Sequence, residues 1–120
     1  MSRFVFSVVV GIWMSHPFMS DVLRALKKGI RFTDHAFHVM YSAERLVTVD
    51  EVVEALRVGD VVEDYVDDPR GHSCLVLGFT RARRPVHVVC APMDEFLVVV
   101  TAYEPRLNKW MPDFRVRRKS

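Results

Sequence analysis

Two histidines have the side chains best suited to acid–base chemistry in this chain, and they occur in different local contexts. His35 lies in the run Phe-Thr-Asp-His-Ala, which is typical of the beginning of a helix. His87 lies in the run Pro-Val-His-Val-Val, and Tyr103 closes a later apolar run, so both are expected on strands. A neutral imidazole accepts a proton and a charged one donates it. We therefore take His35 as a candidate base, His87 as a candidate acid and Tyr103 as an orienting group.

Each of these residues also has a purely structural interpretation. The dipole of its helix favours a neutral His35, but the same residue can simply help to cap that helix. His87 can satisfy a hydrogen bond in the core, or it can point toward a polar cluster with Thr101 and Tyr103. His35 and His38 are three residues apart, a spacing that can chelate metal. No pattern indicates a third ligand, so we predict neither a metal nor a cofactor.

A basic stretch with interleaved aromatic residues lies near the C-terminus. It includes Arg106, Trp110 and Arg117, and Arg45 lies further upstream. Arginines offset phosphate charge and aromatic rings stack on RNA bases, so these four residues are the candidate RNA-binding residues. A solvated basic tail explains the same composition.

A chain of 120 residues, half of them apolar, fits a single globular domain that can bury a core. Residues 48–68 carry eight acidic side chains and one arginine, whereas residues 69–120 carry ten basic and four acidic ones. This asymmetry suits a polyanion on one face and a basic partner on another, and it also fits an ordinary solvated surface. Cys74 and Cys90 match no zinc spacing. They are expected to be buried thiols of a cytoplasmic protein, although a cross-strand disulfide is conceivable.

The apolar run at residues 4–14 is too short to span a membrane. It can be an arm packed on the domain, a weak signal segment, or an extension upstream of a later start. Helix signals begin only at Ser20. We therefore predict residues 1–19 as an appendage and residues 20–120 as a single domain.

Capping residues and hydrophobic periodicity predict three helices followed by a sheet. The helices are expected at residues 21–28, at 34–43 after a Thr33 cap, and between a Thr48 cap and Gly59. The strands are expected at residues 61–66, 73–80, 85–91 and 96–103. Because the links are short, the fold should be α+β, with N-terminal helices followed by a four-stranded antiparallel sheet. Helices should cover one face of the sheet. The other face should be covered by the N-terminal run, by the C-terminal tail or by a second copy in a homodimer.

From residue 30 to residue 118 the chain resembles a small prokaryotic family known as domain of unknown function 4258. The resemblance rests on the order and spacing of several short patterns, and it covers about three quarters of the chain. The residues that carry it are Thr33, His35, Ala36, Arg45, Gly59, Tyr65, Leu75 to Gly78, Pro85 to Val89, Thr101, Tyr103, Pro105 and Trp110.

This resemblance implies a toxin-like protein similar to the RelE- and BrnT-type RNase toxins, with a RelE-like architecture. It also implies RNA or the ribosome as the target and a zinc-finger antitoxin as a partner. Family members usually carry an Arg-Met pair in the middle of the first family helix. Here the matching stretch is His38-Val39-Met40, so this arginine is missing unless His38 replaces it.

Our leading hypothesis is a metal-independent endoribonuclease that transfers the phosphate to the RNA 2′-hydroxyl. Arg45 with Arg106 or Arg117 would clamp the phosphate. The rival hypothesis is a non-catalytic module that binds a protein through the acidic stretch at residues 50–68 or an exposed strand edge. A DNA-binding repressor ranks last, because the chain offers no credible recognition helix.

Overall fold

The computed structural model describes residues 15–42, 44 and 46–119. This part contains three helices, α1 (Phe18–Lys28), α2 (Asp34–Met40) and α3 (Val49–Val58). Its strands are β1 (Ile30–Phe32), β2 (Asp60–Tyr65), β3 (Ser73–Phe79), β4 (Pro85–Pro92) and β5 (Leu97–Tyr103). The predicted α+β class is confirmed. Among the described helices, none has the length and apolar character needed to cross a membrane.

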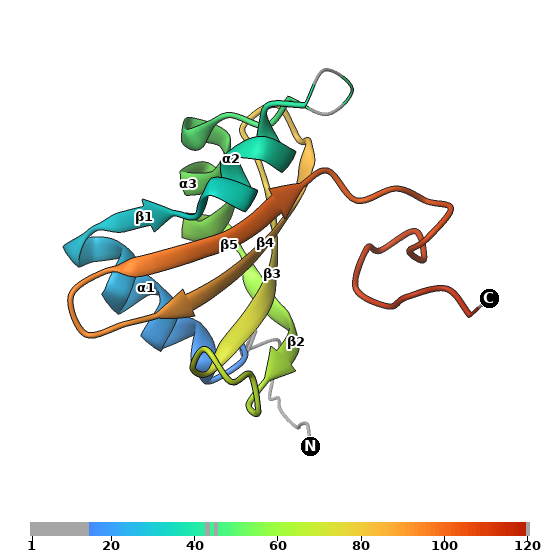
Figure 1. Cartoon of the computed structure of the whole chain (residues 1–120). Helices are drawn as coiled ribbons and strands as arrows, with labels where there is room; N and C mark the ends of the chain where they lie inside the picture. Colours follow the sequence, from blue (N-terminus) through green and yellow to red (C-terminus); the bar gives the residue numbers. More distant parts are fainter. Residues whose placement is uncertain (1–14, 43, 45, 120) are drawn as a thin grey trace.

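The sheet is mixed and has the strand order β1-β5-β4-β3-β2 (Figure 1). Strands β2 to β5 form the expected antiparallel meander. However, β1 joins the edge of the sheet parallel to β5, with Ile30 opposite Leu97. The prediction of four antiparallel strands was therefore wrong by one strand. Three residues are too few to show a two-residue period, although Ile30 and Phe32 do pack against the core while Arg31 between them is exposed.

The predicted caps of α2 and α3 are confirmed. The Thr33 hydroxyl accepts a hydrogen bond from the Ala36 amide at 3.0 Å. Thr48 and Glu51 form a reciprocal capping box at the beginning of α3. Helix α2 ends at Met40, earlier than predicted.

Helix α1 begins at Phe18, three residues before the predicted start. Phe18 and Met19 are buried and belong to the core. The core therefore reaches into the segment 1–19 that the sequence places outside the domain. Residues 1–14, which include the apolar run, lie outside the described residues.

The core lies between the three helices and one face of the sheet. Val76 on β3 faces this core, and α3 approaches β3 very closely at Gly78. A Cβ atom on Gly78 would lie 1.9 Å from the Ala55 carbonyl oxygen. Cys74 and Cys90 are opposite each other on β3 and β4, and both are buried and free. The helix side of the sheet is therefore closed by tight packing, and polar side chains gather on the other side.

Candidate functional site

Strand alternation places His87 on the sheet face that is turned away from the helices. Val86 and Val88 on β4 belong to the helix-side core, so His87 between them faces the opposite way. In the register of the sheet, His87 lies opposite Leu77 on β3 and Tyr103 on β5. The rings of His87 and Tyr103 meet edge to face, with centroids 5.4 Å apart.

The C-terminal segment, which we define as residues 104–119, covers His87 on this face. It leaves β5 on the side away from the helices (Figure 1). Trp110 is only 3% exposed, and its ring centroid lies 4.4 Å from that of His87. A backbone bridge between Trp110 and Arg117 closes the segment into a loop. Trp110 is therefore packed against the sheet and does not present a free face to an RNA base.

His87 is fully buried, and both of its ring nitrogens have partners. Nε2 lies 2.8 Å from the Phe114 carbonyl oxygen, which can only accept, so Nε2 carries the proton. Nδ1 then accepts from the Tyr103 hydroxyl at 3.3 Å. Burial lowers the pKa of His87 below its ordinary value, although the Phe114 hydrogen bond and the charge of Glu63 oppose this effect. The neutral imidazole therefore anchors the C-terminal segment and is not a free acid.

Glu63, Tyr65 and Arg117 form a charged cluster next to His87. Arg117 donates to the Glu63 carboxylate from Nε at 2.8 Å and from Nη2 at 3.0 Å, and its guanidinium lies 4.6 Å from the Trp110 ring centroid. The Tyr65 hydroxyl also donates to Glu63. Burial alone raises the pKa of Glu63, but the hydrogen bonds from Arg117 and Tyr65 outweigh it and hold this pKa below its ordinary value. Burial and the bond to Glu63 raise the pKa of Tyr65 to about 12.

This cluster joins a carboxylate that can accept a proton to a guanidinium that can bind a phosphate. The Glu63 side chain is 22% exposed and that of Arg117 is 60% exposed, so solvent reaches both groups. A planar guanidinium pairs with phosphate as well as with carboxylate. A phosphate that binds Arg117 would therefore compete with Glu63 and release its carboxylate from the ion pair, so that this carboxylate, still bonded to Tyr65, could act as a base.

His35 does not join this cluster. It lies on α2, whose Ala36 and Met40 pack into the helix-side core, whereas His87 faces the other side of the sheet. His35 and His87 therefore lie on different sides of the sheet, and the structure does not bring them together as one acid–base pair. His38 is exposed, and the described residues contain no group of three side chains suited to hold a metal.

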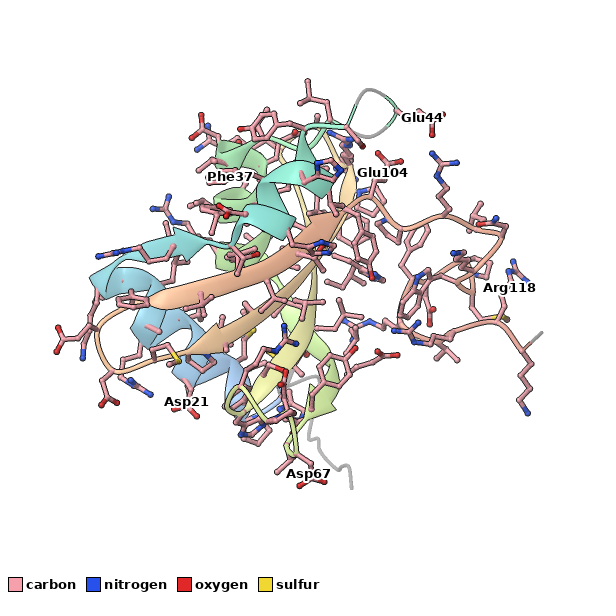
Figure 2. All side chains as sticks on the ribbon, viewed as in Figure 1. Asp21, Phe37, Glu44, Asp67, Glu104 and Arg118 are labelled. Carbon is pink, nitrogen blue, oxygen red and sulfur yellow. The ribbon has the colours of Figure 1, made fainter. Side chains whose placement is uncertain are left out.

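The predicted arginines occupy different parts of the molecule. Arg45 lies outside the described residues. Arg117 belongs to the cluster with Glu63. Arg106 lines a small pocket of about 70 Å³ with Glu44, Arg84 and Glu104. Figure 2 labels Glu44 and Glu104, which lie close to the end of β5. Arg106 and Arg117 thus belong to two separate charged groups. The predicted phosphate clamp pairs Arg45 with one of these two arginines, and it stays a prediction because Arg45 lies outside the described residues.

Sequence reasoning missed Glu63 because it falls in the acidic stretch that was interpreted as a protein-binding surface. A local signal was present: Glu63 and Tyr65 are two residues apart on β2, so the strand period places both on one face. The basic composition points to Arg117, but the sequence contains no signal for its pairing with Glu63, which lies 54 residues away.

Comparison with family models matches residues 32–104 to a family described as "Domain of unknown function (DUF4258)". The matched range runs from the end of β1 to the residue after β5 and includes Glu63, Tyr65, His87 and Tyr103. No curated protein and no solved structure matches the chain. Trp110 and Arg117 follow the matched range, so residues beyond it supply the segment that covers the site.

Proposed function

The chain belongs to the family described as Domain of unknown function (DUF4258), and from this premise we propose that it is a toxin-like, metal-independent endoribonuclease. The observation that carries the proposal is the contact between Glu63 and Arg117 on a partly exposed sheet face. Lys109 and Arg118 are exposed on the same C-terminal segment as Arg117, and Figure 2 shows Arg118 on the side away from the helices. This concentration of cations suits a polyanionic substrate.

In the proposed reaction, an RNA phosphate replaces Glu63 on the guanidinium of Arg117. The freed Glu63 carboxylate accepts the proton of the adjacent 2′-hydroxyl. The 2′-oxygen attacks phosphorus, the bond to the 5′-oxygen breaks, and that oxygen takes a proton from water. The products are a 2′,3′-cyclic phosphate and a 5′-hydroxyl. Arg117 offsets the negative charge that builds up on the phosphate in the transition state.

His87 and Tyr103 are positioning residues in this proposal. His87 holds the Phe114 carbonyl and packs against Trp110, on whose ring Arg117 rests. This arrangement explains why a buried neutral imidazole sits beside the charged pair. His35, on the other side of the sheet, has no part in the reaction.

The RelE-like architecture belongs to the same proposal, as do a ribosome or RNA target and a zinc-finger antitoxin partner. These three expectations come from the family resemblance. The RelE-like architecture is supported by helices that cover one face of an antiparallel meander while the charged cluster lies on the other. The free, buried Cys74 and Cys90 support a reducing compartment, so we propose the cytoplasm as the location.

Cleavage of total RNA in the presence of EDTA, with and without ribosomes, tests the proposal. Wild type is compared with Glu63→Gln, which keeps the shape of the side chain but removes the basic carboxylate. Glu95→Gln is the matched control, because Glu95 is an exposed acid in the turn between β4 and β5. We expect Glu63→Gln to lower the cleavage rate by about 100-fold or more and Glu95→Gln to leave it unchanged.

Two results would overturn the proposal. One is a folded wild-type protein that cuts no RNA under either condition. The other is Glu63→Gln cutting as fast as wild type while its circular dichroism and thermal unfolding match those of the wild type.

A further inference from the structure

An open groove of about 700 Å³ lies between α1 and α3, on the opposite side of the sheet from the Glu63 cluster. Both helices lie on the same side of the sheet (Figure 1). The apolar part of its lining comes from α1, β1 and α3 and consists of Leu23, Leu26, Ile30 and Val53. Leu23 is 39% exposed. The groove thus presents aliphatic side chains to solvent, in contrast to the fully buried core beneath it.

Three basic side chains also line this groove. They are Arg24 and Lys27 on α1 and Arg57 on α3. Arg24 is already paired with Asp21 at 3.0 Å, and Figure 2 labels Asp21 beside α1. Lys27 and Arg57 are exposed, and within the described part of the chain neither has an ion-pair partner. The groove therefore combines aliphatic side chains with two exposed cations on two different helices, neither of which forms an ion pair with another described residue.

The lining favours a polypeptide over a nucleic acid. None of the described residues that line the groove is aromatic, so they offer no ring on which a base could stack. Aliphatic side chains in the groove suit the leucine, isoleucine and valine side chains of another protein. Lys27 and Arg57 suit acidic residues that flank such an apolar stripe.

The lining residues span about one turn of each helix, from Leu23 to Lys27 on α1 and from Val53 to Arg57 on α3. A short amphipathic helix can place an apolar stripe at positions i, i+3 and i+4 in a groove between two helices. We propose that the α1–α3 groove is a docking site for an acidic amphipathic helix of a partner protein.

The test uses a synthetic peptide of about 15 residues, acetylated and amidated, with leucines on one helical face and glutamates beside them. Binding to the full chain is measured by fluorescence anisotropy and by the NMR shifts of residues 21–30 and 53–57. We expect saturable binding that weakens at least 10-fold in the double variant Lys27→Glu/Arg57→Glu. The control Lys109→Glu/Lys119→Glu reverses two exposed charges on the other side of the sheet and should bind like wild type.

Further measurements distinguish an acidic helix from other possible occupants of the groove. A peptide with the same leucines but lysine in place of glutamate should bind at least 10-fold more weakly. Equal binding of the two peptides overturns the proposal, and so does the absence of saturable binding to wild type. A single-stranded RNA that shifts residues 21–30 more strongly than the peptide, or self-association that Lys27→Glu/Arg57→Glu abolishes, would assign the groove to another occupant. Glu63→Gln should leave peptide binding unchanged, because this inference does not depend on the RNase proposal.

Discussion

Replacing His87 with phenylalanine tests whether the buried imidazole holds the C-terminal segment on the sheet. Phenylalanine keeps a ring against Trp110 but removes the N–H group that donates to the Phe114 carbonyl at 2.8 Å. A buried acceptor that loses its donor costs about 1–3 kcal/mol. The bond from Tyr103 to Nδ1 is longer, at 3.3 Å, and should contribute less. We therefore expect His87→Phe to lower the free energy of unfolding by about 1–3 kcal/mol.

Urea unfolding followed by circular dichroism measures this loss, and hydrogen exchange locates it. We expect faster amide exchange at residues 106–118 in His87→Phe and little change in α3. His87→Gln is the matched control, because its side-chain amide keeps an N–H donor of similar reach. His87→Gln should retain more of the protection of amides 106–118 against hydrogen exchange than His87→Phe does.

The same comparison has a pH dependence, because burial lowers the pKa of His87 in the folded protein. Above the unfolded-state pKa of about 6.5, both states hold a neutral imidazole. Below it, the unfolded chain binds a proton that the folded protein does not. As the pH falls below this value, the free energy of unfolding of the wild type therefore decreases by up to about 1.4 kcal/mol per pH unit, until the folded-state pKa of His87 is reached. His87→Phe lacks this effect, so the stability gap between the two proteins should narrow between pH 7 and pH 5.

The reasoning fails if His87→Phe and wild type have the same free energy of unfolding at pH 7 and the same rates of amide hydrogen exchange at residues 106–118. It also fails if the gap widens toward pH 5, since that would mean that the folded protein binds the proton more tightly than the unfolded chain.

Two further predictions concern the helix-side core. Gly78→Ala places a Cβ 1.9 Å from the Ala55 carbonyl oxygen, so it should lower the free energy of unfolding by about 1–3 kcal/mol or more in thermal unfolding. Gly29→Ala, whose nearest contact would be at an ordinary 3.6 Å, is the control and should cost less. Contact with Cys74 and burial raise the pKa of Cys90 well above its ordinary value, so iodoacetamide at pH 8 should label this thiol only after unfolding. Rapid labelling of the folded protein would contradict a closed core around the pair.

Features set by residues close together in the chain were predictable. Thr33 and Thr48 cap helices because a hydroxyl reaches an amide only three residues away. The meander from β2 to β5 follows from apolar runs that are joined by short turn segments. Strand β1 was not predictable because it has only three residues and forms a strand only by pairing with β5, which begins at Leu97.

In the candidate site, too, some features are set locally by the sequence and others by the tertiary structure. The sequence by itself determined that His87 points away from Val86 and Val88 on β4, because neighbouring side chains on a strand face opposite ways. It likewise placed Glu63 and Tyr65 on one face of β2. Only the tertiary structure decided that the helices cover the valine side, which puts His35 across the sheet from His87. It also decided that the C-terminal segment brings Trp110 and Arg117 to the other side. The alternation of a strand is a local backbone property, whereas the choice of the covering element depends on contacts between distant segments that only packing selects.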